Sequence, residues 1–65
     1  MVALKNNIKL RRLKLGLTVR ELAKISGVPA SFISEIETEK RVPNVEIAIR
    51  LARALRCSVE KLFTV

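Results

Sequence analysis

The sequence lacks two of the side chains from which active sites and metal sites are most often built. None of its 65 residues is histidine or aspartate, and Cys57 is the only cysteine. One cysteine can form neither an intrachain disulfide nor a metal cluster, and we expect it to be a small buried hydrophobic residue. No nucleophile and base can be combined from the other side chains. The sequence therefore predicts a protein that is not an enzyme and that binds no metal or cofactor.

Aromatic residues and long apolar runs are also scarce. Phe32 and Phe63 are the only aromatic residues, and the β-branched residues do not alternate along any run, which favours an all-α fold. No apolar run approaches the roughly 18 residues of a membrane span. We expect no signal peptide and a cytoplasmic protein. A basic helix lying on a membrane fits poorly, because the first basic segment has neither Trp nor Phe.

The chain is basic, and its charge is uneven. Residues 1–24 carry seven Lys or Arg against a single Glu, whereas residues 25–65 carry six against five Glu, for a net charge of +7. With 49% apolar residues, a chain of this length can form one small domain over residues 1–65. The basic excess indicates a polyanionic partner, although a solvated surface is equally compatible with the charge alone.

The stretch LTVRELAKISGVPASFISEIE, residues 17–37, predicts two short helices joined by a tight turn. Thr18 and Glu21 have the spacing of a capping box, which starts a helix. Gly27 ends that helix because glycine adopts the left-handed conformation without a Cβ penalty, and Pro29 suits the first turn of the next one. Two helices separated by such a turn form a helix-turn-helix. The pattern places them at about residues 19–26 and 30–37.

Three further helices are expected around this pair. Asn6 or Asn7 can cap the first, and Asn44 and Ser58 can cap the last two, because their side chains accept hydrogen bonds from free backbone N–H groups. These helices are expected at about residues 6–15, 45–55 and 59–63. The fourth helix should bury the apolar residues at helical spacing along it, namely Val45, Ala48, Leu51, Ala52 and Leu55.

Several short motifs follow one another in a fixed order along the chain. They are Leu15-Gly16-Leu17-Thr18, Glu21-Leu22-Ala23, Gly27-Val28, Ile33-Ser34, Ile36-Glu37, Lys40, Pro43, Ala52 to Leu55, Ser58, Leu62 and Phe63. In this order and spacing, the chain from Ile8 to Phe63 resembles the Cro and phage-repressor type of helix-turn-helix protein, often called the XRE family. The resemblance implies a compact all-α bundle of five short helices, with the lambda-repressor-like fold and the helix-turn-helix at the second and third.

Arg12 lies on the apolar stripe of the first predicted helix, where a charge is costly unless it is paired. In the resembling repressors an arginine at this place pairs with the glutamate that ends the recognition helix, which implies an ion pair between Arg12 and Glu37. The alternative is that the arginine stem extends to water. Glu39 and Arg56 stand where the family commonly has glycine, so we expect backbone strain there or a different turn.

In a helix-turn-helix the second helix lies in the major groove, and its first residues meet the base edges. The resemblance assigns base reading to Ala30, Ser31 and Glu35. Ala30 could contact a thymine methyl group, Ser31 could bond several base edges, and Glu35 could accept from cytosine N4. Alternatively, Ala30 is only small enough to allow close approach, and Glu35 is only solvated. None of the three offers the two-donor contact of arginine with guanine.

Contacts with the DNA backbone need charge and position but no sequence readout. Thr18 opens a helix whose free N–H groups suit a phosphate, with Arg20 in its first turn. Lys9 can add positive field from the first helix. If about five of these groups bind phosphates, log K should fall against log[salt] with a slope near −4 to −5. The full set of predicted backbone contacts is Thr18, Arg20, Ser34, Lys40, Arg41, Asn44 and Arg11.

The sequence therefore predicts a sequence-specific transcriptional regulator that binds double-stranded DNA, and we expect a repressor. We expect a prokaryotic or phage protein that associates with the nucleoid. One such domain covers only a half-site, so a homodimer on a palindromic operator is expected. The alternative is an antitoxin or protein-interaction adaptor on the same fold. For Leu62 and Phe63, ordinary core packing is the alternative to a role in self-association. The predicted dimer surface is the apolar tail, Val59, Leu62, Phe63 and Val65.

Overall fold

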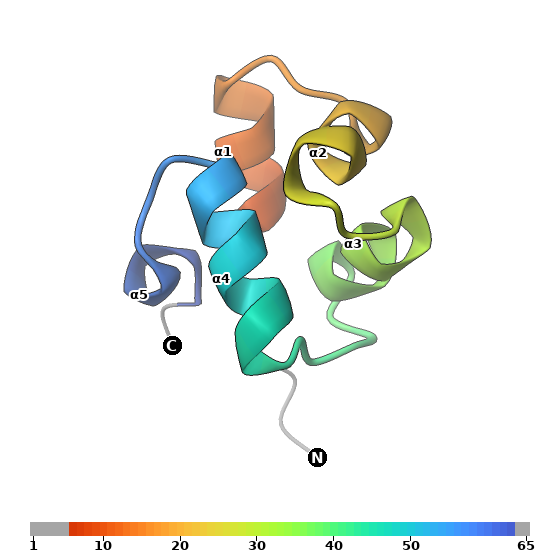
Figure 1. The fold of residues 1–65 in the computed structure, drawn as a ribbon, viewed down its shortest axis with the longest axis vertical. Coiled ribbons are helices and arrows are strands. Elements are labelled where there is room, and N and C mark those ends of the chain that lie inside the picture. The colour runs from red at the N-terminus through yellow and green to blue at the C-terminus, as the bar shows by residue number, and fades with distance from the viewer. Residues whose placement is uncertain (1–5, 64–65) are drawn as a thin grey trace.

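The computed structural model describes residues 6–63, and the regular structure in that range is entirely helical. The expectation of an all-α bundle with five short helices is confirmed. The first helix begins at Ile8 rather than at residue 6. In Figure 1, α2 and α3 lie on one side of α4, and α5 lies on the other. The helices are α1 (Ile8–Lys14), α2 (Val19–Ser26), α3 (Ala30–Glu37), α4 (Val45–Ala54) and α5 (Val59–Leu62).

The core lies between the helices and is built from aliphatic side chains. Ile33 and Ile36 of α3 are fully buried, so one face of this helix is fixed to the body of the protein. Val28, in the turn between α2 and α3, is 2% exposed and fills the angle between them. The core cluster consists of Ile8, Leu22, Val28, Ile33, Ile36, Leu51, Ala52, Leu55 and Leu62.

Side-chain caps start three of the helices. Oγ1 of Thr18 accepts from the N–H of Glu21 at 3.1 Å, and Oε1 of Glu21 accepts from the N–H of Thr18 at 2.9 Å, so α2 begins with the predicted capping box. Asn44 and Ser58 accept in the same way from N–H groups in the first turns of α4 and α5. The side chain of Asn7 makes no such bond, whereas Oδ1 of Asn6 accepts from the first N–H of α1.

Within residues 6–63, four helices end at a residue with positive φ. Gly27 ends α2 with φ of 75°, as predicted, and the other three helices end in a shared left-handed turn that uses glycine only once. Gly16 follows α1 with φ of 71°, Glu39 follows α3 with φ of 62°, and Arg56 follows α4 with φ of 57°. After α3, the N–H of Lys40 bonds back to the carbonyl oxygen of Glu35 at 2.8 Å, and equivalent bonds close the other two turns. The chain therefore keeps the turn that glycine favours, and Glu39 and Arg56 bear the strain of a Cβ in it.

Two apolar positions differ from the predicted burial. Val45 is 75% exposed, so the structure corrects its place in the buried stripe of α4. It starts the helix most of a turn before Ala48, the first buried residue of α4, and the core does not reach it. Cys57 is only partly buried and packs against the edge of the core.

Candidate nucleic-acid interface

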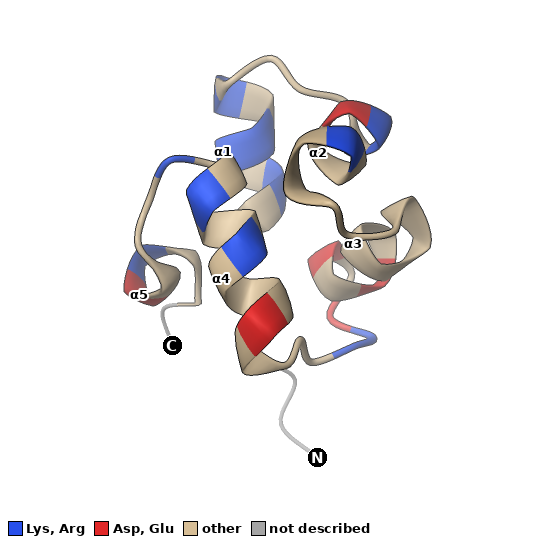
Figure 2. Ribbon diagram, in the orientation of Figure 1, with Lys and Arg blue, Asp and Glu red and all other residues tan. Residues whose placement is uncertain are grey.

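α3 presents one face to the core and the opposite face to solvent. Ser31 and Ser34 are exposed, Ala30 is partly buried, and the Glu35 side chain is 43% exposed. Because residues four apart share a helix face, Ala30 lies in line with Ser34, and Ser31 lies in line with Glu35. The helix has acidic residues but no Lys or Arg (Figure 2). Its outward face therefore offers a methyl group, two hydroxyls and a carboxylate.

Behind α3, a buried ion pair fixes the end of the helix to α1. Nε of Arg12 lies 2.8 Å from Oε2 of Glu37, and Nη2 donates to Oε1 at 3.2 Å, with side-chain exposures of 9% and 7%. Nη1 of Arg12 donates to the carbonyl oxygen of Leu17 at 2.9 Å. The hydrogen bond with Glu37 raises the pKa of Arg12 above its ordinary value, against the lowering effect of burial. The pair that the resemblance implies is present, and it holds α3 from the inner side.

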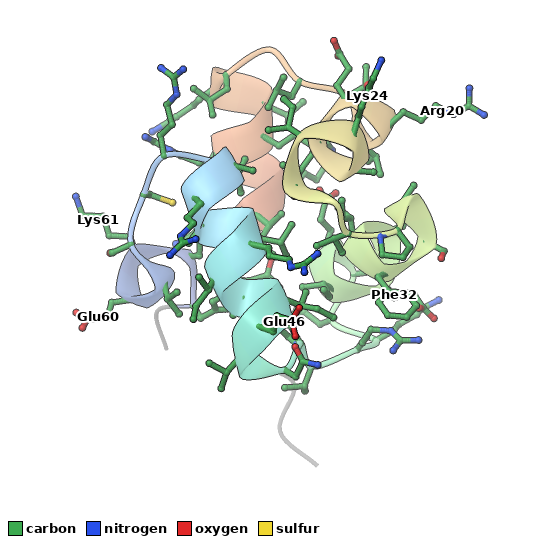
Figure 3. The ribbon with its side chains drawn as sticks, viewed as in Figure 1. Arg20, Lys24, Phe32, Glu46, Glu60 and Lys61 are labelled. Carbon is green, nitrogen blue, oxygen red and sulfur yellow. The ribbon has the colours of Figure 1, made fainter. Side chains whose placement is uncertain are left out.

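In front of α3, Arg41 folds back from the loop onto the helix. Its Nε lies 2.9 Å from Oε1 of Glu35, and its guanidinium carbon lies 3.9 Å from the centre of the Phe32 ring. Figure 3 shows Phe32 at the outer surface of α3. Two residues with separate predicted DNA contacts thus bind each other. Sequence reasoning missed Phe32 as their platform, although an aromatic residue beside the outward positions of α3 is a signal that could have indicated it.

Cationic groups flank α3 on two sides. Arg20 and Lys24 project from α2 (Figure 3), and Lys40 is exposed in the loop that follows α3. Figure 2 shows basic residues on α2 and on the loop after α3, whereas α3 itself carries only acidic residues. Asn44 is exposed at the start of α4, where its side-chain oxygen accepts from the N–H of Ile47 at 2.8 Å. The predicted backbone contacts at Arg20, Lys40 and Asn44 therefore stand at the borders of the helix.

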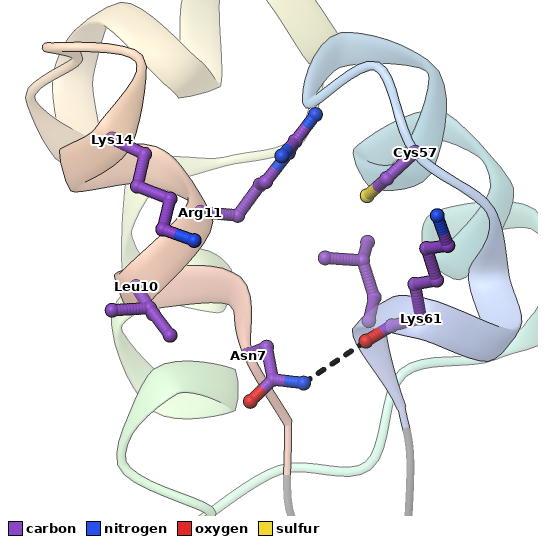
Figure 4. Close-up of a pocket in the computed structure, with 7 residues that line it drawn as sticks. Asn7, Leu10, Arg11, Lys14, Cys57 and Lys61 are labelled. Carbon is purple, nitrogen blue, oxygen red and sulfur yellow. Dashed lines mark hydrogen bonds between the residues drawn. The ribbon is translucent and has the colours of Figure 1, made fainter.

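Arg11 lies apart from this set. Its Nε donates to the carbonyl oxygen of Leu55 at 3.0 Å, and its Nη2 donates to that of Arg56 at 3.2 Å, so it holds the carbonyl end of α4. With Cys57 and Lys61, it lines a pocket of about 200 Å³ between α1 and α5 (Figure 4). α5 and α3 lie on opposite sides of α4 (Figure 1). Arg11 thus lies apart from α3 with its guanidinium bound to the end of α4, and its contact with the DNA backbone stays a prediction.

An apolar groove of about 420 Å³ runs along α4 and α5. Leu62 is 1% exposed and belongs to the core, so the structure corrects its place in the predicted association surface. The single turn of α5 directs Leu62 inward and leaves Val59 at the surface. Val65 lies outside the described residues. The apolar side chains lining the groove include Val45, Ile49, Val59 and Phe63.

Two other kinds of site are absent from the part of the chain that the structure describes. None of the helices between residues 6 and 63 is long and apolar enough to cross a lipid bilayer. Over the same residues, no three acidic, cysteine or histidine side chains come together in a way that could hold a metal ion.

The sequence between residues 8 and 62 matches the family model described as helix-turn-helix. The chain belongs to the XRE-type helix-turn-helix family. This is a family of DNA-binding transcription regulators, which in general are not enzymes. The match covers all five helices, so the resemblance inferred from the order of short motifs is confirmed.

Relatives of similar sequence are also named as helix-turn-helix transcriptional regulators. The chain is 35% identical over 60 residues to an uncharacterized HTH-type transcriptional regulator of Archaeoglobus fulgidus, covering 92% of this chain and 86% of the relative. It is 34% identical over 56 residues to an uncharacterized HTH-type transcriptional regulator of Mycobacterium tuberculosis, covering 86% of this chain. The match spans only 40% of the mycobacterial protein's length.

A solved structure shares the fold. The restriction-modification controller protein C.AhdI from Aeromonas hydrophila superposes with a TM-score of 0.83 and is 28% identical in sequence. The superposition covers 88% of this chain and 86% of C.AhdI. The five-helix arrangement of this chain is thus also that of C.AhdI, in agreement with the predicted fold class.

Proposed function

We propose that this chain binds a specific sequence of double-stranded DNA with α3 in the major groove and represses transcription by occupying a promoter. The observation that carries the proposal is the outward face of α3, which exposes Ser31 and Ser34 and is bordered by cations on α2 and in the loop after α3. The family, and relatives named as transcriptional regulators, support a regulatory role. Such a protein works in the cytoplasm, on nucleoid or phage DNA.

The backbone contacts of this proposal follow from groups left available in the structure. The capping box uses the N–H groups of Thr18 and Glu21, so a phosphate at the start of α2 would meet those of Val19 and Arg20 and the Arg20 side chain. Lys40, on the other side of α3, makes no ion pair with residues 6–63. These contacts fix the position of the protein on the duplex without reading its sequence.

Base reading is proposed for the small residues at the start of α3. Ser31 is exposed and offers a hydroxyl that can donate to or accept from base edges, and Ala30 offers a methyl group to thymine. Ser34, one turn further along, is exposed on the same side and is proposed to bond a phosphate. Their small size favours close approach of α3 to the floor of the groove.

We further propose a homodimer on a palindromic operator, formed through the groove along α4 and α5. Val45 and Val59 expose apolar surface there, and Asn44, a proposed backbone contact, lies at the same end of α4. A two-fold axis through this groove would set two copies of α3 along one face of the duplex, as half-sites one helical turn apart require.

Selection of bound sequences from a random DNA pool, followed by titration of the selected duplex, tests the central proposal. We expect a consensus with two-fold symmetry and a slope of log K against log[salt] of about −4 to −5. Arg20→Ala and Lys40→Ala should each weaken binding to every sequence and reduce the slope by about one. Failure to select any sequence would exclude this function and favour the adaptor or antitoxin alternative, which needs no DNA consensus.

Sedimentation tests the homodimer separately. Val59→Asp places a charge in the groove and should shift the protein towards monomer. Ile25→Asp is the matched control, because Ile25 is 59% exposed at the end of α2, outside the groove. A chain that remains monomeric at high concentration, with and without its selected operator, would rule out the dimer.

A further inference from the structure

The base-reading set on α3 lacks the residue type that makes the commonest specific contact in the major groove. That contact is an arginine with two donors to O6 and N7 of guanine. α3 has no arginine of its own. The structure nevertheless holds a guanidinium against its outer face, because Arg41 returns from the loop to lie on Phe32 and beside Glu35.

We propose that Arg41 reads a guanine in the major groove and that Glu35 and Phe32 position it, an inference that rests on the DNA-binding function proposed above. Glu35 stands at a predicted base-reading position. A guanidinium 2.9 Å from its carboxylate belongs to the outer face of α3 rather than to the loop. If the outward face of α3 enters the major groove, the Arg41 guanidinium therefore enters the groove with it.

The geometry of the guanidinium suits this role. Nε of Arg41 is engaged by Oε1 of Glu35, and neither Nη1 nor Nη2 donates to an acceptor within residues 6–63. These two nitrogens form one edge of the planar group and carry parallel donors. The Phe32 ring, 3.9 Å below the guanidinium carbon, restricts the plane of the group. A restrained planar fork with its outer edge open matches the O6 and N7 acceptors of guanine.

The charges on the two sides of the pair favour a base contact over a phosphate contact. Glu35 alone would be repelled by DNA, and Arg41 neutralises it where α3 would approach the bases. An arginine that moved out to a phosphate would leave that carboxylate unpaired beside the duplex. Lys40 precedes Arg41, is exposed, and forms no ion pair with the described residues, so it is the loop cation available to a phosphate. The loop thus divides two tasks between neighbouring residues.

The turn that carries Arg41 back is built into the backbone. Glu39 has φ of 62°, and the N–H of Lys40 bonds to the carbonyl oxygen of Glu35, which reverses the chain directly after α3. Arg41 therefore begins close to the helix that it contacts. The guanidinium is pre-organised before DNA binds, and this lowers the entropy lost in forming the contact.

The first experiment compares sequence selection by the wild-type chain and by Arg41→Lys. Lysine keeps the charge but loses the planar fork. We expect a guanine at one fixed position of each half-site for the wild type. Arg41→Lys should lose roughly 5- to 150-fold of the preference at that position alone. Arg20→Lys is the matched control and should keep every preference, because its proposed contact is with the backbone.

The second experiment replaces that guanine by 7-deazaguanine, which lacks the N7 acceptor but keeps the shape of the base pair. Wild-type affinity should fall by at least about fivefold, and Arg41→Lys should lose little further affinity. Glu35→Ala and Phe32→Leu should also weaken the discrimination against 7-deazaguanine. A merely structural role for these two residues would instead change the unfolding midpoint and leave base preference intact, which would overturn their assignment as positioning residues.

The outcomes separate this inference from the function on which it rests. If the wild type selects no sequence, the DNA-binding proposal fails and this inference fails with it. If it selects a consensus without guanine, or if Arg41→Lys keeps the guanine preference, only the inference is overturned. A uniform loss of affinity for all duplexes on Arg41→Ala, with a salt slope lower by about one and equal sensitivity to 7-deazaguanine, would assign Arg41 to a phosphate instead.

Discussion

α3 bears two ion pairs of the same chemistry on opposite sides. Glu37 pairs with Arg12 behind the helix, where the side chains are 7% and 9% exposed, and Glu35 pairs with Arg41 in front, where they are 43% and 40% exposed. The closest nitrogen–oxygen distances are almost equal, 2.8 Å and 2.9 Å. Their surroundings differ, and so do their expected contributions to stability and to binding.

The position of an ion pair relative to the core decides what the pair does. Removing one partner of a buried pair leaves an uncompensated charge without water, whereas removing one partner of an exposed pair leaves a hydrated one. The inner pair therefore acts as an anchor of α3. The outer pair lies in water and leaves Nη1 and Nη2 of Arg41 without an acceptor among residues 6–63, so the same helix is fixed on one side and open to a ligand on the other.

The largest expected effect comes from the inner pair. Arg12→Ala should lower the free energy of unfolding by about 3–5 kcal/mol, because it strands the Glu37 carboxylate in the core and removes the donor to the carbonyl oxygen of Leu17. Urea unfolding followed by circular dichroism measures the loss. Arg11→Ala is the matched control on the same helix. Arg11 is partly exposed, and losing its hydrogen bonds to the end of α4 should cost about 1 kcal/mol.

A loss below about 1 kcal/mol for Arg12→Ala would mean that the pair does not anchor α3. A double variant, Arg12→Met with Glu37→Leu, sharpens the comparison. Apolar replacement of both buried charges removes the need to pair them, so it should recover much of the stability that the single change loses. The same logic predicts no such recovery for the outer pair, where little stability is lost at first.

How far the sequence predicted this architecture depends on the distance between interacting residues. The cap of α2 joins Thr18 and Glu21, three residues apart, and such local signals are legible from spacing alone. The inner pair spans 25 residues, and only the resemblance to a family indicated it. The acceptors of Arg11 lie 44 and 45 residues away, and periodicity carries no information about them.

The outer face of α3 was predictable only in part. Helical periodicity distinguishes the outward Ser31 from the buried Ile33. It does not reveal that a loop residue returns to the helix, because the path of Arg41 depends on the φ of Glu39 and on the Phe32 surface. Val45 is exposed for a comparable reason. Burial near a helix end depends on what the neighbouring elements cover.

The turn at Glu39 follows Glu37 of the inner pair and precedes Arg41 of the outer pair. Glu39→Gly should stabilise the protein by about 0.5–1 kcal/mol, because glycine accepts φ of 62° without a Cβ clash, partly offset by the greater freedom of the unfolded chain. Glu39→Ala is the control, because it removes the carboxylate but keeps the Cβ and should bring no comparable gain. Equal stability changes for the two variants, in urea unfolding, would show that charge rather than backbone strain matters at this position.

A smaller effect is expected from the outer pair itself. Glu35→Ala and Arg41→Ala should each lower the free energy of unfolding by only about 0.2–1 kcal/mol, since both partners remain hydrated. The loss should shrink further as salt screens the interaction. Thermal unfolding at low and high ionic strength measures both quantities. If either variant lost as much unfolding free energy as Arg12→Ala, and the loss did not depend on salt, the two ion pairs would not differ in their contribution to stability.

The smallest effect is expected at Glu21. Its carboxylate is exposed, as that of Glu35 is, but it accepts a hydrogen bond from the backbone N–H of Thr18. The N–H of Thr18, and after it the Thr18 hydroxyl, lower the pKa of Glu21 relative to the unfolded chain. A lowered folded-state pKa means that the charged capping box contributes stability above the unfolded pKa of about 4.3 and loses it as pH falls through the folded value.

Glu21→Gln keeps an oxygen acceptor for the N–H of Thr18 at every pH, so its unfolding midpoint should fall less than that of the wild type between about pH 5 and pH 3. Glu39→Gln controls for the loss of one negative charge elsewhere on the surface. The other carboxylates titrate in both proteins and cancel in the difference between wild type and Glu21→Gln. Parallel acid profiles for these two proteins would show that the charge of Glu21 adds nothing beyond the neutral oxygen acceptor that Gln also provides to the N–H of Thr18.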